Sequence, residues 1–245
     1  MTASIALAMW SGPRNLSTTM MRSFGSRADT RCSDEPFYAA YLDMTGVEHP
    51  MRSEILEHHE RDPARVAESL LPPPGPVEGP VIHYQKHMAH HMVEGMPRGW
   101  MKRARHVFLV RHPARVIASY LKKTGTVSLE AIGFPIQVEL FEEARTLTGE
   151  IPVVVDSDAI LRDPPGLLER LCRAIDIPWD PAMLAWTPGP KPEDGAWAPH
   201  WYDAVWASSG FGPPPGELPE VPEEHREVFT AALEGYRGLV AHRLE

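Results

Sequence analysis

Cysteine is scarce in this chain, since its 245 residues include only Cys32 and Cys172. Two cysteines cannot build a disulfide framework, and such sparse use is typical of proteins in a reducing compartment. Long apolar runs are missing too, because the first run, at residues 5–10, is too short for a signal peptide or a membrane-spanning helix. These absences favour a cytoplasmic protein that does not insert into a membrane.

An excess of positive charge is also missing. Lysine and arginine together number 24 against 33 acidic residues, which gives a net charge of −9. This balance argues against a general nucleic-acid partner and against an anionic membrane surface. A site for a small anion would therefore have to be a local basic pocket in an acidic protein.

The third absence is a motif, Gly-x-x-x-x-Gly-Lys-Ser/Thr, the phosphate loop of many ATP-binding proteins. The residues after the first apolar run are nevertheless typical of a phosphate site, and they read Ser11-Gly12-Pro13-Arg14-Asn15-Leu16-Ser17-Thr18-Thr19. A strand that turns through glycine into a helix start directs free backbone N–H groups at one point, which favours an anion there. The segment therefore predicts a phosphate loop with Arg14 as its fixed cation.

Short apolar segments alternate with helical patterns, which predicts an α/β fold with a central, mostly parallel sheet between layers of helices. The strands are expected at residues 5–10, 31–33, 81–85, 106–110 and 152–155. Helices are expected to start at Pro113 and Pro164, because proline is favoured in the first turn. A terminal helix is expected at about 223–243, and the length suits a single domain, residues 1–245.

Residues 178–222 form a proline- and tryptophan-rich segment with little regular periodicity. Tryptophan is usually well buried, yet it also favours positions that need a polar contact. The segment is therefore either an aromatic cover over a ligand or an irregular part of the core. Residues 72–80 and 213–222 are expected to be stiff, proline-rich connectors within the domain.

A second basic motif follows the fourth expected strand. That strand delivers Arg111 to its carboxyl end, where open α/β sheets bind ligands. Ser119 lies seven residues after His112, or about two helical turns, and so shares a face with the start of the next helix. Arg111 and Ser119 can both reach one small anion. The alternative is that Arg111 pairs locally and Ser119 faces solvent.

These motifs resemble those of sulfotransferases that use 3′-phosphoadenosine 5′-phosphosulfate (PAPS) as the donor. The loop is similar to the family's 5′-phosphosulfate loop, often Pro-Lys/Arg-Ser-Gly-Thr/Ser-Thr, and Arg111 with Ser119 matches its 3′-phosphate motif. Asp156–Pro164 is similar to a later Tyr-Glu-Asp-Leu-x-x-Asp-Pro segment. The resemblance covers residues 5–175 in the family's order. It implies a three-layer P-loop fold and sulfuryl transfer to a hydroxyl or amine of a small-molecule acceptor.

The resemblance also implies roles for individual residues. Arg14 takes the place of the basic residue that contacts the bridging oxygen of the donor, while Arg111 and Ser119 would hold the 3′-phosphate. The 5′-phosphate would lie in the loop, on Ser11, Gly12, Pro13, Arg14, Asn15, Leu16, Ser17, Thr18 and Thr19. The chain departs from the family by placing Leu16 where glycine is common, and by lacking an Arg-Lys-Gly segment, for which Lys191 is an open substitute.

The acceptor needs a base near the sulfur, and two residues are candidates. His87 resembles the catalytic histidine of a Lys-Thr-His sequence, and Glu35 resembles a position where some bacterial members carry a catalytic glutamate. We favour His87 here because histidine titrates nearest neutral pH. The alternatives are structural: a buried, hydrogen-bonded histidine, and a loop cap beside Pro36.

No metal is expected. A transferring sulfuryl group carries less charge than a phosphoryl group, so Arg14 and backbone dipoles can neutralise the leaving phosphate. His83, His87, His90 and His91 cluster in sequence, but the glutamate of a His-Glu-x-x-His site is missing. Two other functions stay open: a small-molecule kinase using ATP–Mg²⁺, with Asp156 as a candidate metal ligand, and a nucleotide-binding protein without catalysis. The oligomeric state is open too.

Overall fold

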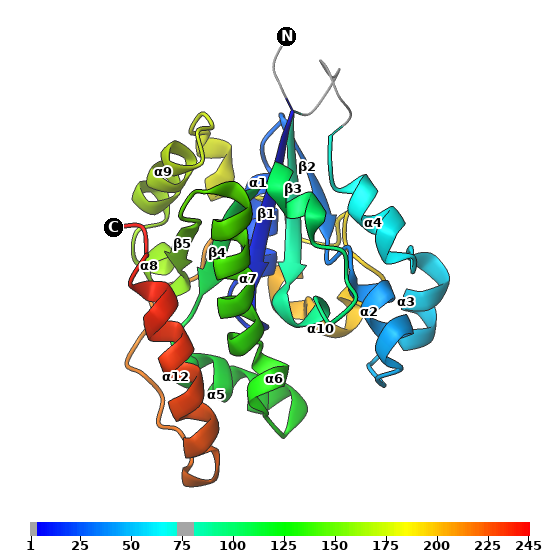
Figure 1. Ribbon diagram of the computed structural model, residues 1–245. Coiled ribbons are helices and arrows are strands. Elements are labelled where there is room, and N and C mark those ends of the chain that lie inside the picture. The colour runs from blue at the N-terminus through cyan, green and yellow to red at the C-terminus, as the bar shows by residue number, and fades with distance from the viewer. Residues whose placement is uncertain (1–3, 73–80) are drawn as a thin grey trace.

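A five-stranded parallel sheet forms the centre of the protein (Figure 1). The computed structural model describes residues 4–72 and 81–245. The strands are β1 (Ile5–Ser11), β2 (Thr30–Asp34), β3 (Ile82–Met88), β4 (Arg105–Val110) and β5 (Val153–Asp156). They lie in the order β2-β3-β1-β4-β5, and every pair is parallel. The five expected strands and the α/β class are confirmed.

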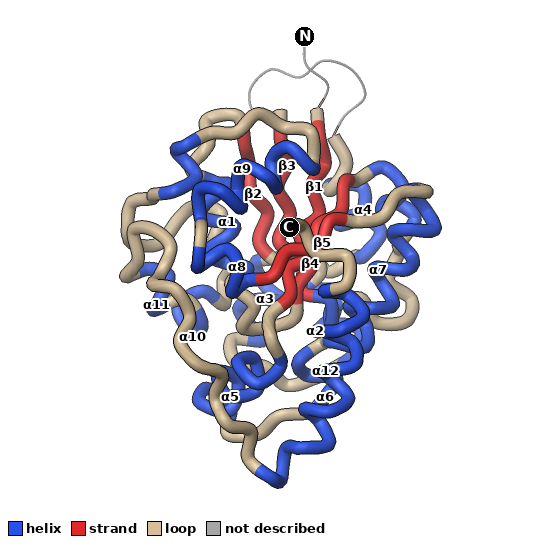
Figure 2. The backbone as a smooth tube through the Cα atoms, turned by 90° about the vertical axis from the view of Figure 1, so that its left-hand side faces the viewer, coloured by secondary structure: helices blue, strands red, loops and turns tan. Residues whose placement is uncertain are grey.

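Helices connect the strands and cover both faces of the sheet, as Figure 2 shows from the side. The α-helices are α1 (Ser17–Gly25), α2 (Tyr38–Thr45), α3 (Arg52–His58), α4 (Pro63–Ser69), α5 (Pro113–Thr124), α6 (Leu129–Ile132), α7 (Phe134–Thr148), α8 (Ser157–Arg162), α9 (Pro164–Ala174), α10 (Ala198–Trp201), α11 (Asp203–Trp206) and α12 (Arg226–Val240). Short 3₁₀ helices are η1 (Ala89–His91), η2 (Gly99–Arg103), η3 (Pro181–Leu184) and η4 (Glu223–His225).

Two apolar cores lie on the two faces of the sheet. The first contains Leu7 and Met9 of β1 and packs against α1 and α9. The second contains Ala8 and Trp10 of the same strand and packs against α4, η2 and α7. Because side chains alternate along a strand, neighbouring residues of β1 enter opposite cores. This arrangement gives the three layers that the sequence predicts.

Local capping explains where two of the predicted helices begin. The His112 ring accepts the Ala114 N–H at the start of α5, and Pro113 follows it in the first turn. The Asp163 carboxylate accepts the Gly166 N–H at 3.0 Å before α9. Both prolines occupy a position whose N–H has no partner inside the helix, so they cost nothing there. The predicted starts at Pro113 and Pro164 are confirmed.

The C-terminal part divides into an irregular segment and a helix, as expected. Residues 178–222 contain η3, α10 and α11 between loops, and α12 follows η4. The helix ends at Val240 rather than near residue 243, and Leu244 N–H then donates to Val154 O beside β5 at 2.8 Å. Most of the expected 72–80 connector lies outside the described residues. Among the described helices, none has the length and apolar character needed to cross a bilayer.

Candidate active site

The carboxyl ends of the parallel strands meet at one edge of the sheet, where open α/β sheets bind ligands. A cavity of about 290 Å³ opens there, and we call it the inner cavity. Its wall combines the β1–α1 loop, the residues just after β2 and β3, the start of α5 and part of α10–α11. The fold therefore gathers segments from most of the chain length around one space.

The β1–α1 loop is held in place by close backbone contacts. A Cβ atom on Gly12 would lie 2.4 Å from the Ile132 carbonyl oxygen, so only glycine fits. The buried Ser157 hydroxyl donates to Asn15 O and to Val110 O, both at 2.8 Å, and ties the loop to the end of β4. Ser11 and Gly12 do not line the inner cavity; residues 13–19 do.

Leu16, the departure from the family pattern, has the backbone conformation that glycine favours. Its φ is 68° and its ψ is 11°, in the left-handed region, and Arg14 has a φ of 64°. Such a conformation costs a leucine about 1 kcal/mol or more. The Leu16 side chain packs against the first core. The loop therefore has, at Leu16, the left-handed backbone conformation typical of glycine, which we call the glycine-type path, although the residue is leucine.

The loop presents unused polar groups to the cavity. The first N–H groups of α1 have no acceptor inside the helix, and no side chain caps them. Both polar atoms of the Asn15 side chain are buried, and neither has a hydrogen-bond partner among the described residues. Buried polar groups without partners are rare and costly. Among these groups, the donors, which are the helix N–H groups and the Asn15 amide nitrogen, fit an anionic ligand.

Arg14, Arg111 and Ser119 lie together at the cavity wall. Arg14 Nε donates to Ser119 Oγ at 2.9 Å, and an Arg111 N–H donates to Arg14 O at 3.1 Å. Burial and the charge of Arg111 lower the pKa of Arg14. The Asp158 carboxylate offsets part of the positive charge of Arg111, since it lies 3.6 Å from Arg111 Nε; it also lies 2.7 Å from Arg115 Nε. Two neighbouring guanidinium groups favour an anion between them.

Glu35 also lines the inner cavity, where it belongs to an ionic cluster. The buried ammonium of Lys86 contacts Glu35 and donates to Asp34 Oδ1 at 2.8 Å and to Tyr202 Oη at 2.7 Å. Tyr202 in turn donates to Asp34 Oδ2 at 2.7 Å. One ammonium therefore serves two carboxylates, which leaves the cluster one negative charge in excess when both are ionised.

The pKa of Glu35 is raised to about 7 from its ordinary value of 4.5, because burial, the largest cause, and the charge of Asp34 together outweigh the opposing effect of Lys86. Burial lowers the pKa of Lys86, but Asp34 and Glu35 outweigh it, so the net pKa lies well above the ordinary value and the amine stays charged. A carboxyl group that titrates near neutral pH, at the wall of a cavity, has the properties of a general base.

His87 does not line the inner cavity. It alternates with Lys86 on β3, so its ring points to the opposite face of the sheet, where it stacks on Trp10 with ring centroids 4.4 Å apart. Its Nε2 contacts Gln85 Oε1 at 3.2 Å, and burial lowers its pKa well below the ordinary value. Its surroundings match the structural alternative, a buried and hydrogen-bonded histidine.

Several cavity residues have no counterpart among the residues that the sequence singled out. Lys86 and Tyr202 belong to the ionic cluster. His91, which the sequence marked only as part of the histidine cluster, lies with its Nε2 3.9 Å from Glu35 Oε2. The one signal in the sequence was a lysine inside an otherwise buried strand, since such a lysine needs a partner. Tyr202 lies 168 residues from Asp34 and gave no signal.

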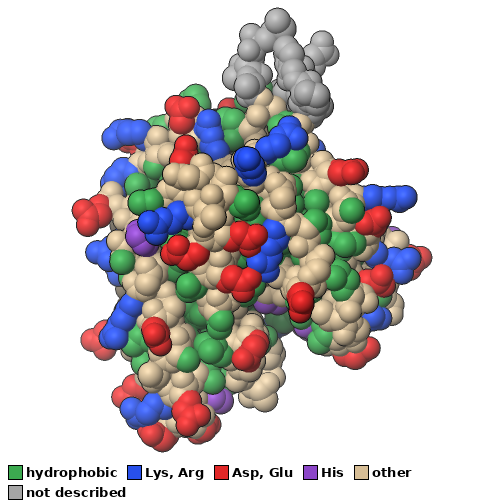
Figure 3. All heavy atoms as spheres, in the orientation of Figure 1, with side chains coloured by type: hydrophobic (Ala, Val, Ile, Leu, Met, Phe, Trp, Pro, Cys, Tyr) green, Lys and Arg blue, Asp and Glu red, His purple; other side chains and the backbone are tan. Residues whose placement is uncertain are grey.

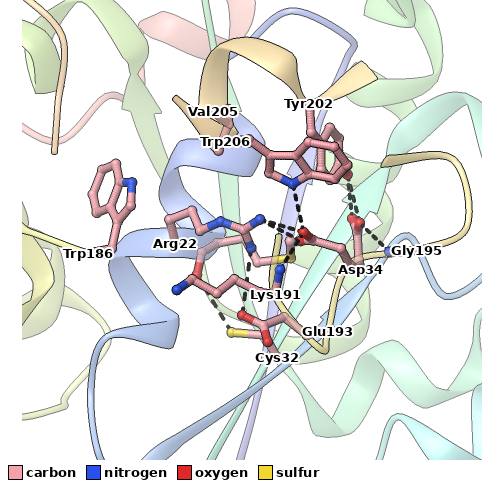
Figure 4. A network of polar contacts seen from close by, with 12 residues as sticks. Arg22, Cys32, Asp34, Trp186, Lys191, Glu193, Gly195, Tyr202, Val205 and Trp206 are labelled. Carbon is pink, nitrogen blue, oxygen red and sulfur yellow. Dashed lines mark hydrogen bonds and ion pairs between the residues drawn. The ribbon is translucent and has the colours of Figure 1, made fainter. Parts of the chain in front are cut away.

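The tryptophan-rich segment is both a cover and part of the core. Trp197 is buried in the first core, whereas Trp201 lines the inner cavity under the Lys123 ammonium, 5.4 Å from its ring. Figure 4 shows the anchors of the segment: Gly195 N–H and Tyr202 approach Asp34, and Arg22 of α1 faces Glu193 and Trp206. Arg22 also forms a buried ion pair with Asp194 at 2.7 Å.

Two further expectations concern Lys191 and metal binding. The Lys191 ammonium contacts Thr187 and does not line the inner cavity, so it does not substitute there for the missing basic segment. Within residues 4–72 and 81–245, no group of three His, Cys, Asp or Glu side chains has the arrangement of a metal site. Asp156 caps α8 and accepts the Tyr236 hydroxyl at 2.6 Å, away from the cavity.

Two curated proteins of Arabidopsis thaliana are similar in sequence to this chain. They are named branched-chain-amino-acid aminotransferase-like protein 2 and protein 1, and each is 35% identical over 233 residues. The match covers 95% of this chain and 41% of each relative. The chain therefore spans about two fifths of the length of the curated relatives it matches.

Three solved structures share the fold over nearly their whole length. The sulfotransferase domain of the Synechococcus olefin synthase has a TM-score of 0.57 at 15% identity, covering 97% of this chain and 96% of its own. The sulfotransferase of Alicyclobacillus acidocaldarius has a TM-score of 0.56 at 12% identity, covering 99% and 98%. The sulfotransferase domain of the curacin biosynthetic pathway has a TM-score of 0.52 at 11% identity, covering 94% and 98%.

These distant structures show only that the fold is shared. A family model assigns the chain to a family. The model described as a sulfotransferase domain matches residues 5–243, which include the β1–α1 loop, Glu35, Arg111 and Ser119. The chain belongs to the sulfotransferase domain family.

Proposed function

We propose that this chain transfers a sulfuryl group from PAPS to a hydroxyl or amine of a small-molecule acceptor, and that residues 1–245 act as a single sulfotransferase domain. The observation that carries the proposal is the meeting of a basic phosphate loop, a second arginine–serine pair and a carboxyl group of raised pKa in one cavity. The names of the plant relatives refer to chains of which this match covers 41%.

In this proposal the two anionic ends of the donor bind at two places. The N–H groups of residues 17–19, with Asn15, hold the 5′-phosphosulfate, and Arg111 with Ser119 holds the 3′-phosphate. The unpartnered Asn15 amide nitrogen and the adjacent guanidinium groups of Arg14 and Arg111 support this assignment, because these are hydrogen-bond donors that an anion can accept from.

The reaction needs one bond formed, one broken and one proton moved. The acceptor oxygen or nitrogen forms the new bond to sulfur, and the bond between sulfur and the bridging oxygen of the donor breaks. Arg14 stabilises the charge that grows on the leaving phosphate, which departs as adenosine 3′,5′-bisphosphate. We assign Glu35, and not His87, as the base that takes the acceptor proton, because Glu35 lines the inner cavity and His87 does not.

The two other functions have less support in the site. A kinase would bind Mg²⁺ with ATP, but Asp156, its candidate ligand, caps α8 and lies outside the inner cavity. Leu16 in place of the common glycine would favour a binding protein without catalysis, but its backbone follows the glycine-type path. Glu35 with its raised pKa has no role in such a protein.

The first experiment compares ligands by thermal shift. Adenosine 3′,5′-bisphosphate is expected to raise Tm, since a ligand of the native state stabilises by mass action, and ATP–Mg²⁺ is expected to do so less. Stabilisation by ATP–Mg²⁺ alone would overturn the donor assignment.

The second experiment measures transfer of labelled sulfate from PAPS to a panel of phenols, alcohols and amines. Arg14→Ala is expected to lower kcat/KM by about 10²–10³-fold, the range for loss of one charge-stabilising donor. Arg65→Ala is the matched control, because the Arg65 side chain is 73% exposed on α4 and does not line the inner cavity. Equal activity of the Arg14 variant and its control contradicts the role of Arg14.

A further inference from the structure

A second and larger cavity, of about 800 Å³, adjoins the inner cavity; we call it the outer cavity. It lies among α2, the loop after it, residues 92–98 and the α6–α7 turn. His49, His90 and Tyr120 line both cavities, so the two spaces share a wall of three residues. Figure 3 shows a recess on this face, between the surfaces over α6 and α2, with histidine side chains inside it.

Most of the outer wall near this junction is apolar or aromatic. Tyr41, Met92, Val93 and Ile136 line it, and the Tyr41 ring packs edge-on against His90 at 5.9 Å. Burial lowers the pKa of His90 to about 4, so its ring adds no positive charge. Such a wall suits a flat or extended apolar body of a size typical for small-molecule sites.

The charged residues of the outer cavity do not line the inner cavity; they are Glu94, Arg98, Glu130 and Glu139. Arg98 is the one arginine or lysine among the lining residues, and it donates to Glu139 at 2.5 Å and to Glu143 at 2.7 Å. Glu94 and Glu130 are exposed carboxylates at the same wall. Neither has an ion-pair partner within residues 4–72 and 81–245. The outer end is therefore acidic.

One buried polar atom at the junction is unpartnered. His90 Nδ1 has no hydrogen-bond partner among the described residues, although solvent does not reach it. A neutral ring nitrogen there can accept a hydrogen bond from, or donate one to, a ligand that passes from one cavity to the other.

We propose that the outer cavity binds the body of the acceptor, and that this acceptor is an elongated, apolar molecule carrying a protonated amine at the end remote from the accepting hydroxyl. The inference rests on the proposed function. The hydroxyl end passes His90 into the inner cavity toward Glu35, the apolar body lies along Tyr41 and Ile136, and the amine meets Glu94 and Glu130. The same carboxylates repel the polyanionic donor from the acceptor space.

The test uses three probes with the same hydroxyphenyl-hexyl body, ending in an ammonium, a neutral acetamide or a carboxylate. Their affinities are measured by calorimetry with adenosine 3′,5′-bisphosphate bound. The ammonium probe is expected to bind about fivefold to tenfold more tightly than the acetamide probe, and the carboxylate probe more weakly than both, because two exposed charges contribute modestly. The difference is expected to shrink at about 0.5 M salt.

Glu94→Gln/Glu130→Gln is expected to abolish the preference for the ammonium. Glu224→Gln/Glu227→Gln is the control, since it removes the same charge from exposed positions in η4 and in the first turn of α12 and is expected to keep the preference. Ile136→Trp fills the outer cavity and is expected to weaken all three probes at least tenfold while adenosine 3′,5′-bisphosphate still binds.

The outcomes separate this proposal from the proposed function. No ammonium preference in the wild-type protein, a preference that survives Glu94→Gln/Glu130→Gln, or no binding of any probe overturns the acceptor assignment. Failure of adenosine 3′,5′-bisphosphate to bind overturns the donor assignment instead, and the probe measurements are then repeated without it and decide the acceptor question on their own.

Discussion

Replacing Glu35 by glutamine tests the assignment of the base most directly. Glutamine keeps the shape of the side chain and a hydrogen-bond acceptor for Lys86, but it cannot take a proton from an acceptor hydroxyl. Loss of a positioned general base typically costs about 10²–10⁴-fold in rate. Glu35→Gln is therefore expected to lower kcat/KM for transfer from PAPS by that factor, with little change in the affinity for adenosine 3′,5′-bisphosphate.

The pH dependence of activity carries a second signature of this carboxyl group. The base must be ionised, and the pKa of Glu35 is raised to about 7 by burial. The wild-type kcat/KM is expected to rise with pH and to level off above about pH 7. The residual activity of Glu35→Gln is expected to lack this rise. An unchanged rise in the variant, or a wild-type profile that is flat from about pH 5.5 to 8, refutes the assignment.

Stability provides a third readout, and its sign follows from the same pKa. The folded pKa of Glu35, about 7, lies above its ordinary value of 4.5, so the folded state keeps a proton that the unfolded chain loses first. The resulting stabilisation is complete below pH 4.5 and is lost as pH rises through 7. At ~1.4 kcal/mol per pKa unit, the free energy of unfolding changes by about 3 kcal/mol across this range.

Glutamine does not titrate, so Glu35→Gln removes this pH dependence. As pH rises from acid to mildly alkaline values, the free energy of unfolding of the variant, measured with urea, is expected to increase by about 3 kcal/mol relative to that of the wild-type protein. Lys86 remains paired with Asp34 in the variant, so its own charge state is not the source of the change. A stability difference that is the same at both ends of the pH range refutes the raised pKa of Glu35.

Three further substitutions test the loop and β3. Leu16→Gly is expected to be more stable than Leu16→Ala by about 1 kcal/mol in urea unfolding, because only glycine is unstrained at a φ of 68°; the reverse order contradicts the strain. Lys86→Met is expected to destabilise the fold by about 3–5 kcal/mol and to shift the rise in kcat/KM to higher pH, since it leaves two carboxylates without their cation; an unshifted profile speaks against the coupling to Glu35. His87→Gln is expected to keep kcat/KM within about threefold of the wild-type value after correction for folded protein, and a loss as large as that of Glu35→Gln would return His87 to the role of base.

The strands and the second basic motif were predictable because their signals are local. Each apolar run is short and bounded by turn residues, and Pro113 and Asp163–Pro164 mark helix starts within one or two residues. The position of Ser119, on the same face as the start of its helix, follows from helical spacing alone. In the structure its Oγ lies 2.9 Å from Arg14 Nε. The face on which a residue lies depends only on the residue spacing within its own helix or strand, so it can be predicted from the sequence of that element.

The side of the sheet to which β3 residues point was not predictable. All seven residues of β3 are buried, so no alternation of polar and apolar side chains marks a face. A shift of one residue exchanges the two faces, which is why Lys86 rather than His87 meets the inner cavity. The ionic cluster is also invisible in the sequence, because Tyr202 reaches Asp34 across 168 residues and its segment has no periodicity.

Leu16 shows which part of the loop determines the path of its backbone. The residue does not favour a left-handed conformation, so the surroundings must impose it: Ser157 holds Asn15 O, Gly12 packs under Ile132 O, and α1 begins at the next residue. Strain of this kind persists only where neighbouring contacts outweigh it, and it gathers at functional sites. A leucine in place of the common glycine therefore leaves the N–H groups aimed into the inner cavity. The proposed anion site therefore depends on the anchored loop, and not on the identity of residue 16.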